Sequence, residues 1–239
     1  MSKIIEIKDL KKTFVMGKTT NEVLKGINLS IDKGEFISIM GQSGSGKSTL
    51  LYLMGALDRP TSGTIKINGK DISKLYDKEC SIFHRREVGF VFQFYNLVPN
   101  LNVEDNILLP VLLDHKKAKD YEDRLEELLE AVGLEERRKF TPRELSGGQQ
   151  QRVAIARALI MDPDLIFADE PVGNLDSKAG IKVMELLRDI NKKYNKTIVQ
   201  VTHSPEHATY GTRLINIKDG LVDEQKEEKS EKRTRKPKK

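Results

Sequence analysis

The fold is decided by the stretch FISIMGQSGSGKST, which occupies residues 36–49. Its first part, Phe36 to Met40, is apolar enough to predict a buried strand, and a helix-like run from Lys47 to Leu57 follows the glycines. Residues 41–49 match the pattern G-x-x-x-x-G-K-[ST]. In this context backbone N–H groups turn inward and the helix N-terminus attracts phosphate. A chance glycine turn would lack both flanking elements, so the sequence predicts a phosphate-binding loop.

Two side chains of this loop suit contact with a nucleotide and its metal ion. The ammonium of Lys47 is expected to reach the terminal phosphates, and Ser48 offers a hydroxyl oxygen, the kind of ligand that Mg²⁺ prefers. Kinases, GTPases and many ATPases carry such a loop, so the class must come from elsewhere in the chain. The predicted nucleotide-binding residues of the loop are Gly41, Gln42, Ser43, Gly44, Ser45, Gly46, Lys47, Ser48 and Thr49.

A second helix start suited to phosphate follows in the run Leu145, Ser146, Gly147, Gly148 and Gln149. Ser146 and Gln149 form an S-x-x-Q capping box at the start of a helix predicted to run from Gln149 to Met161, and the two glycines allow a ligand to approach closely. Capping boxes are common structural features. This one is notable because it carries two glycines in a chain that already has a phosphate loop.

Acidic and imidazole groups stand at the ends of two later apolar strands, predicted at residues 165–168 and 197–202. Asp169 and Glu170 follow the first strand, and His203 follows the second. Strand ends are where α/β sheets place their ligand chemistry. Asp169 is suited to hold Mg²⁺ through water, Glu170 to polarise an attacking water, and His203 to reach a terminal phosphate. Each group alone would be read as a structural cap or a structural histidine.

The rest of the chain alternates short β-branched runs with helical patterns. Strands are predicted at residues 4–8, 24–31 and 64–67, and a helix at residues 118–132 with Gly133 as its C-terminal stop. Hydrophobic residues make up 38% and charged residues 32% of the 239 residues, which is typical of a globular protein. The pattern predicts an α/β fold with a mostly parallel sheet and an antiparallel lobe.

Charge and cysteine content limit the expected partners and location. The net charge is +5, and the segment Lys226 to Lys239, with eight basic and three acidic residues, accounts for all of it. The remaining residues are neutral, so no nucleic-acid partner is expected. We expect residues 226–239 to form a disordered tail, with weak contact to anionic lipid as the alternative. The N-terminus shows no secretory segment, and the lone Cys80 suits a reducing compartment, so we expect a cytoplasmic protein.

The order of these motifs resembles that of the ABC ATPases, and the resemblance covers residues 3–224. Residues 88–99 and 147–159 look like the branch that includes LolD, MacB and FtsE, and bacitracin-export ATPases are similar too. The resemblance implies a P-loop NTPase of the ABC type. It would have a RecA-like, mostly parallel core and an antiparallel β lobe within residues 1–225, and a helical subdomain at about residues 94–160.

The family also implies how such a chain works. ATP would lie between the phosphate loop of one subunit and the LSGGQ motif of the other, so that a homodimer closes on ATP and drives an integral membrane permease encoded on another chain. The protein would then lie at the inner face of the membrane. By the same resemblance Gln93 contributes to catalysis and to the Mg²⁺ site, Asp176 lies at the dimer interface, and Phe94 to Pro99 line the groove for the permease.

A few positions differ from the family pattern. Phe14 stands where an aromatic residue, often tyrosine, stacks on adenine, and it keeps the π-face needed for that contact. Phe94 and Val172 replace a common glutamine and a common threonine, and neither change removes a catalytic group. Ser204 replaces an aspartate that often follows the histidine, which is expected to affect how His203 is oriented.

Other function classes remain open beside the transporter subunit. An FtsE-like regulator of cell-wall hydrolysis that moves no cargo is the first alternative, and a soluble ABC ATPase is the second. The chromosome-maintenance type would need a long coiled coil between the two glycine motifs, and the segment 50–144 is too short to hold one. The translation type would carry two cassettes, and the sequence contains one set of motifs.

Overall fold

The computed structural model describes residues 2–223 of the chain, so the predicted basic tail at residues 226–239 lies outside the described residues. Within residues 2–223 no helix combines the length and the apolar character that crossing a bilayer requires. The helices are α1 Lys47–Met54, α2 Asp77–Arg86, α3 Val103–Leu113, α4 Glu122–Val132, α5 Gly147–Leu159, α6 Ser177–Tyr194 and α7 Pro205–Ala208, with 3₁₀ turns at Ala118–Tyr121, Glu135–Arg137 and Pro142–Glu144.

The larger sheet places the chemistry-bearing strand ends side by side. Its order is β10-β9-β3-β8-β7-β6, and all pairs are parallel except β9 with β10. The strands are β10 Leu221–Asp223, β9 Arg213–Lys218, β3 Phe36–Met40, β8 Thr197–Val201, β7 Leu165–Asp169 and β6 Val88–Phe92. The predicted strands at 36–40, 165–168 and 197–202 are therefore confirmed. Because β3, β8 and β7 are parallel neighbours, the residues that follow them meet at one edge.

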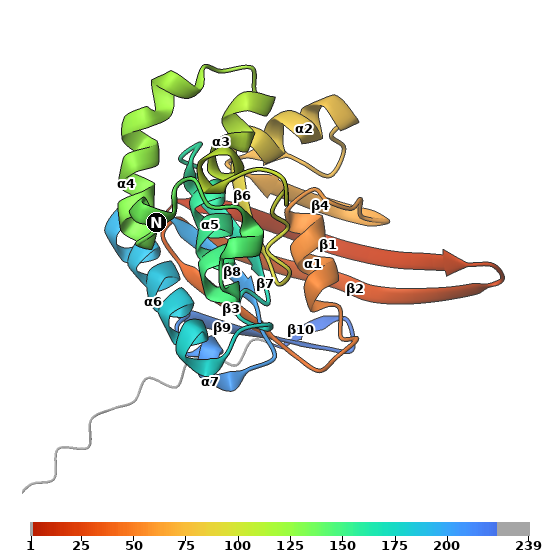
Figure 1. The fold of residues 1–239 in the computed structure, drawn as a ribbon. Coiled ribbons are helices and arrows are strands. Elements are labelled where there is room, and N and C mark those ends of the chain that lie inside the picture. Colours follow the sequence, from red (N-terminus) through yellow and green to blue (C-terminus); the bar gives the residue numbers. More distant parts are fainter. Residues whose placement is uncertain (1, 224–239) are drawn as a thin grey trace, which may run out of the picture.

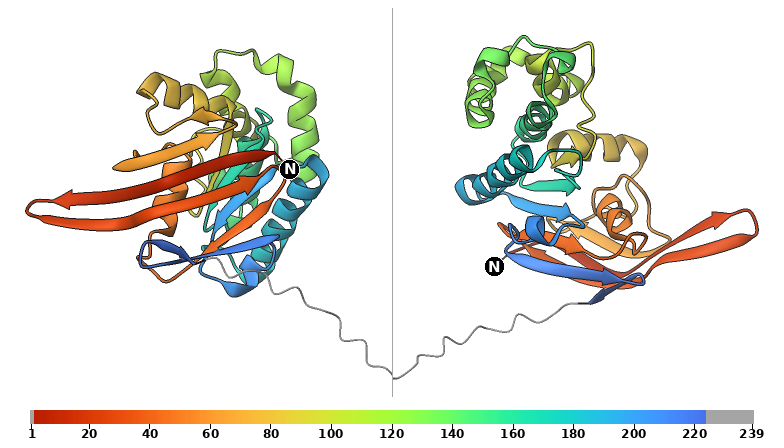
Figure 2. Two further views of the ribbon diagram at one scale, coloured as in Figure 1. Left: turned by 180° about the vertical axis from the view of Figure 1, so that it is seen from behind. Right: turned by 60° about the horizontal axis from the view of Figure 1, so that its bottom comes forward.

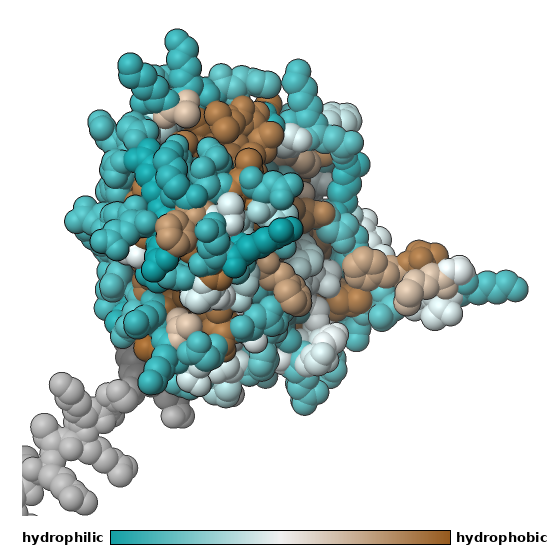
Figure 3. Space-filling view, in the orientation of Figure 1, coloured by the Kyte–Doolittle hydropathy of each residue, from teal (hydrophilic) through white to brown (hydrophobic). Residues whose placement is uncertain are grey.

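The smaller sheet is antiparallel, in the order β2-β1-β4-β5. It consists of β2 Thr19–Asp32, β1 Lys3–Met16, β4 Ser62–Ile67 and β5 Lys70–Asp71. The strands predicted at 4–8 and 24–31 were too short. Beyond residue 10 most side chains are exposed, so the ladder continues without the burial pattern by which a strand is recognised. The resulting hairpin projects from the body in Figure 2, and the space-filling view of Figure 3 shows hydrophobic residues toward its tip, where Val15 and Met16 are exposed.

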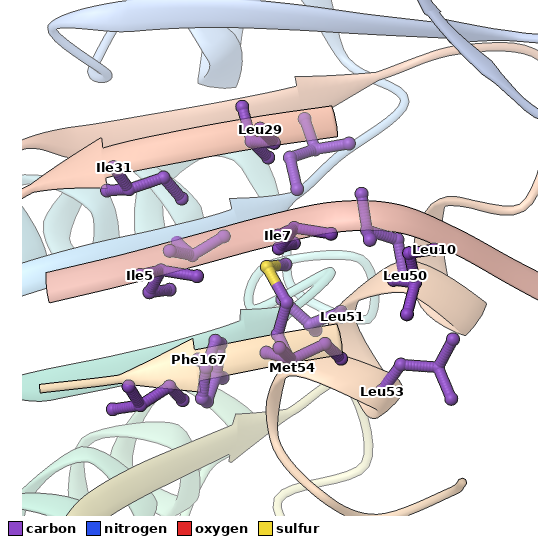
Figure 4. Close-up of a cluster of buried hydrophobic side chains, with 14 of the residues drawn as sticks. Ile5, Ile7, Leu10, Leu29, Ile31, Leu50, Leu51, Leu53, Met54 and Phe167 are labelled. Atoms are coloured by element: carbon purple, nitrogen blue, oxygen red, sulfur yellow. The ribbon is translucent and has the colours of Figure 1, made fainter. Parts of the chain in front are cut away.

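Helix α1 lies between the two sheets and carries the phosphate loop at its N-terminus. Its buried leucines and Met54 pack against the antiparallel sheet and against Phe167 of β7, as Figure 4 shows. The helix was predicted to continue to Leu57 but ends at Met54. Gly55 caps it, and Ala56 adopts a positive φ of 53°, which turns the chain away from the helix axis.

Helices α3, α4, α5 and α6 contribute to a second hydrophobic cluster on the other side of the parallel sheet, whereas Phe83 of α2 belongs to the first cluster. Helices α3, α4 and α5 lie together at one end of the molecule, and α6 runs along the sheet (Figure 1). The helix predicted at 118–132 begins as a 3₁₀ turn and becomes α-helical at Glu122, and Gly133 ends it with a φ of 61°, as predicted. The signature helix runs from Gly147 to Leu159 instead of from 149 to 161, with Ser146 as its N-cap.

Candidate functional site

The phosphate loop connects the end of β3 to the start of α1. Gly41, Gly44 and Gly46 all have positive φ angles, of 155°, 79° and 101°, which glycine adopts without strain. At Gly41 a Cβ atom would lie 2.2 Å from the carbonyl oxygen of Ile217, so the loop passes too close to β9 for any side chain. The Nζ of Lys47 is buried within the loop and donates to the carbonyl oxygen of Gln42 at 2.9 Å. The structure thus places a cation at the N-terminus of α1.

The carboxylate of Asp169 lies directly beside this loop. The Oγ of Ser48 donates to Oδ1 of Asp169 at 3.0 Å, although the two residues are 121 positions apart. Sequence reasoning predicted both residues and their proximity through a shared metal ion. It did not predict Tyr52, whose hydroxyl donates to Oδ2 of the same carboxylate at 2.6 Å. The sequence did contain one indication of this contact: Ser48 and Tyr52 are four residues apart, which puts both side chains on one face of α1.

Glu170 and His203, which were predicted from different strand ends, form a direct pair. The Nδ1 of His203 lies 2.7 Å from Oε2 of Glu170. Glu170 has a left-handed φ of 46°, held by a hydrogen bond from its N–H to Val201 and one from Gly173 to its carbonyl. Among the described residues Oε1 of Glu170 has no hydrogen-bond donor, so this oxygen is available to water. Ser204 accepts a hydrogen bond from His207 as the N-cap of α7, and the imidazole of His203 points instead to Glu170.

Gln93 follows β6 at the same edge of the sheet and pairs with Asn174, and its role at the Mg²⁺ site remains a prediction. Its Nε2 donates to Oδ1 of Asn174 at 3.1 Å, and Nδ2 of Asn174 donates back to the carbonyl oxygen of Gln93 at 3.2 Å. The structure therefore joins Gln93 to the segment after Glu170 and shows no hydrogen bond from Gln93 to Ser48 or Asp169. The adjacent side chain of Phe94 is 73% exposed.

A cleft of about 600 Å³ opens beside the phosphate loop. It is lined by loop residues 41–45, by Asn21, Glu22, Val23 and Lys25 of β2, and by residues of β9, β10 and the turn between them. Phe14 pairs directly with Asn21 across the hairpin, so the two side chains lie on the same face. The ring of Phe14 is 38% exposed, and Nζ of Lys12 lies 4.8 Å from its centroid. Phe14 itself does not line the cleft, and its stacking on adenine remains a prediction.

The signature motif forms a separate site. Oγ of Ser146 accepts from the N–H of Gln149, and Oε1 of Gln149 accepts from the N–H of Ser146, which completes the predicted capping box. A cleft of about 240 Å³ is lined by Ser146, Gly148, Gln149, Arg152, Asp176, Lys178, Ala179 and Lys182. Asp176 caps α6 by accepting from the N–H of Ala179 at 2.9 Å. The structure thus brings Asp176 to the signature motif, and its place at a dimer interface remains a prediction.

The donor set beside the loop fits a magnesium ion bound with a nucleotide. Ser48 and Asp169 offer hard oxygen atoms that already lie within hydrogen-bond distance of each other. Mg²⁺ is commonly held by one or two such protein groups, with phosphate and water oxygens completing the octahedron. Among residues 2–223 no three or more His, Cys, Asp or Glu side chains form a group that could hold a metal ion.

Comparisons with known proteins agree with this geometry. LolD, the ATP-binding protein of the lipoprotein-releasing system of Geobacter metallireducens, is 46% identical over 93% of this chain and 99% of its own length. The ATP-binding/permease protein MacB of Bdellovibrio bacteriovorus is 45% identical over 92% of this chain, which spans 33% of that longer protein. The dimeric cassette MJ0796 of Methanocaldococcus jannaschii, in a post-hydrolysis state bound to ADP and Pi, superposes with a TM-score of 0.83 at 44% identity and covers 92% of this chain and 96% of its own.

A family model described as "ABC transporter" matches residues 24–173, well over half of the chain. The matched range includes the phosphate loop, Gln93, the signature motif, and Asp169 with Glu170. The chain therefore belongs to the ABC transporter family, as one of its ATP-hydrolysing cassettes.

Proposed function

We propose that two copies of this chain bind ATP between them and that hydrolysis drives a membrane permease encoded on another chain. The main observation that supports a dimer is that the N-termini of α1 and α5, both suited to bind phosphate, lie at separate clefts. The cleft beside the phosphate loop and the cleft beside Ser146 have no lining residue in common. A single copy therefore presents two half-sites, and a second copy related by a two-fold axis would complete both. MJ0796 is dimeric in its solved structures, which supports this arrangement.

Within each shared site the residues take separate roles in phosphoryl transfer. Lys47 and the loop N–H groups bind the phosphates, and Phe14 stacks on adenine. Ser48 and Asp169 hold Mg²⁺, which when bound supplies positive charge to the phosphate oxygens. Ser146 of the opposing copy contacts the terminal phosphate through the N-terminus of its helix.

Hydrolysis depends on a water placed between Glu170 and the terminal phosphate. Oε1 of Glu170 accepts a proton from the water, while the hydrogen bond from His203 to Oε2 fixes the carboxylate. His203 is more exposed than Glu170, with side-chain exposures of 69% and 23%, so it faces outward to the phosphate. Gln93 is hydrogen-bonded to Asn174, and through it a structural change on hydrolysis would be transmitted to the neighbouring exposed Phe94.

The permease partner is inferred from the relatives and from the exposed side chain of Phe94. LolD is an ATP-binding subunit of a lipoprotein-releasing system, and MacB joins its cassette to a permease in one protein. Phe94 is 73% exposed and lies next to Gln93, as expected of a side chain that meets another protein. We place the protein on the cytoplasmic face of the membrane through this partner. Lipoprotein or peptide export is the leading activity, and an FtsE-like regulator without cargo is the alternative.

The shared-site mechanism is tested by Glu170→Gln. This variant keeps the phosphate contacts but loses the base, so ATP affinity should be unchanged, turnover should fall by about 100-fold or more, and ATP should produce a stable dimer on a sizing column. Glu130→Gln on the exposed surface of α4 is the matched control and should behave like the unaltered chain. Normal turnover in Glu170→Gln, or a strictly monomeric ATP complex at high protein concentration, would overturn the proposal.

The choice of partner is tested by copurification. The Glu170→Gln chain, held on ATP, is isolated from native membranes and the bound integral membrane protein is identified. A lipoprotein or peptide exporter supports the leading activity, a cell-wall regulator supports the alternative, and recovery without any membrane protein contradicts both.

A further inference from the structure

Tyr52 occupies a position in the site that no motif assigns. Its hydroxyl donates to Oδ2 of Asp169 at 2.6 Å, while Oγ of Ser48 donates to Oδ1 at 3.0 Å. Ser48 and Tyr52 are one helical turn apart, so both hydroxyls come from the same face of α1. Both oxygens of the Asp169 carboxylate, at the end of β7, therefore accept hydrogen bonds from side chains of a single helix, α1.

Both ends of this contact are held rigidly. The neighbours of Tyr52 in α1, Leu51 and Leu53, are buried in the core, and the tyrosine ring packs against the same cluster. Asp169 lies at the end of β7, where it pairs with Phe92 on one side and Val201 on the other. A tyrosine phenol carries its proton at neutral pH and can therefore donate to the Asp169 carboxylate, as the 2.6 Å contact shows.

We propose that Tyr52 is a positioning residue that fixes the orientation of the Asp169 carboxylate for Mg²⁺ bound with ATP. This inference rests on the proposed role of Asp169 as the carboxylate of the magnesium site. Rotation about the terminal torsion of an aspartate is soft, so without an external partner the carboxylate would sample many orientations. A donor on Oδ2 selects the orientation in which Oδ1 faces Ser48.

The contact does not use up the binding capacity of the carboxylate. A carboxylate offers about four lone-pair directions, and the phenol and the Ser48 hydroxyl together occupy two of them. Hydrogen-bond partners of metal ligands orient the ligand, and their loss typically weakens metal affinity by about 10- to 100-fold. Tyr52 has the geometry of such a partner.

The test compares Tyr52→Phe with Tyr76→Phe. Phenylalanine at position 52 keeps the ring that packs on the core and removes only the hydroxyl. Tyr76 is 78% exposed and does not contact Asp169, so Tyr76→Phe is a matched loss of one phenol oxygen at the surface. Binding of fluorescently labelled ATP is measured by titration, first in a chelator without divalent ions and then at increasing Mg²⁺, and thermal melting confirms that both variants fold.

We expect Tyr52→Phe to bind the nucleotide normally without metal and to need about 10-fold more Mg²⁺ for half of the metal-dependent gain in affinity. Turnover should recover as Mg²⁺ is raised, which a general loss of structure would not allow. An unchanged or lower Mg²⁺ requirement in Tyr52→Phe overturns the inference.

Asp169→Asn separates this inference from the role of Asp169 itself. If Asp169→Asn raises the Mg²⁺ requirement and Tyr52→Phe does not, the positioning role of Tyr52 fails while the magnesium site stands. If neither variant changes the requirement, Asp169 is not the metal-binding carboxylate, and the inference about Tyr52 fails together with that part of the proposed function.

Discussion

At the scale of single residues, Lys47 is a buried cation without a counter-charge among the described residues. Its side chain lies in a buried position, yet its ammonium meets the carbonyl oxygen of Gln42 and no carboxylate within the described residues. A buried cation that has only a neutral acceptor is incompletely compensated, because one carbonyl replaces little of its lost hydration. A phosphate anion in the loop would supply the missing charge. The loop backbone and Lys47 thus favour the same ligand.

Lys47→Ala should weaken ATP binding by about 10-fold or more, because a charge-assisted hydrogen bond contributes about 1.5–3 kcal/mol. Calorimetric titration with ATP measures the change. Lys78→Ala, at an exposed position of α2, is the control and should leave the affinity unaltered. An unchanged affinity in Lys47→Ala would remove this lysine from the phosphate site.

Glu170, which we propose as the catalytic base, has a strained backbone conformation. Residues other than glycine rarely adopt positive φ, and Glu170 does so at the point where β7 ends. Such strain persists only where surrounding contacts over-determine it, and here the backbone bonds to Val201 and from Gly173 do so. The turn directs the carboxylate toward His203, which the next strand supplies.

At the scale of elements, a buried carboxylate joins α2 to α3. Asp114 caps α3, and its side chain is only 1% exposed. Nε of Arg86 donates to both of its oxygens at 2.8 Å, and Arg85 of the same helix contacts it at 3.3 Å. Lys116 adds a third cation at 3.6 Å. The hydrogen bond from Arg86, ahead of that from Arg85, holds the pKa of Asp114 below its usual range.

Asp114→Asn should lower the melting temperature at neutral pH, because three cations lose their counter-charge. A lowered folded-state pKa means that the carboxylate contributes stability above its unfolded pKa and loses that contribution as the pH falls through the folded value. The melting difference between Asp114→Asn and the unaltered chain should therefore shrink as the pH drops below about 4. Asp189→Asn, on the exposed side of α6, is the control. A difference that stays constant down to about pH 3 would show that charge is not the cause.

The elements that sequence reasoning found are those whose signal is local. The phosphate loop, the strand before it and the Ser146–Gln149 capping box each depend on residues within a short window. Helix α2 was not predicted, because Phe83 is its only fully buried residue and its other positions form no apolar face. The pairing of Tyr52 with Asp169 spans 117 positions, so no local pattern could have indicated it. Long-range pairing is decided by the fold and is read only from the structure.

At the scale of the whole molecule, the phosphate loop before α1 and the N-terminus of α5 lie at different clefts. The loop before α1 lines the cleft formed with β2, and the N-terminus of α5 lines the cleft formed with α6. One copy therefore offers each half of a site without joining them. If two copies complete each other, every intact site needs Lys47 from one chain and Ser146 from the other.

This requirement predicts that two inactive variants restore each other. Lys47→Ala damages the phosphate half, and Ser146→Arg damages the signature half by filling its cleft and removing the cap of α5. In a mixed dimer one site carries both defects, and the other has an intact Lys47 and an intact Ser146. Equal mixing should therefore recover about a quarter of the normal ATPase rate, because half of the dimers are mixed and each has one working site. Lys47→Ala mixed with the doubly substituted chain contains no intact site and should stay inactive. Equal inactivity of both mixtures, although mixed dimers form on a sizing column, would contradict a site shared between chains.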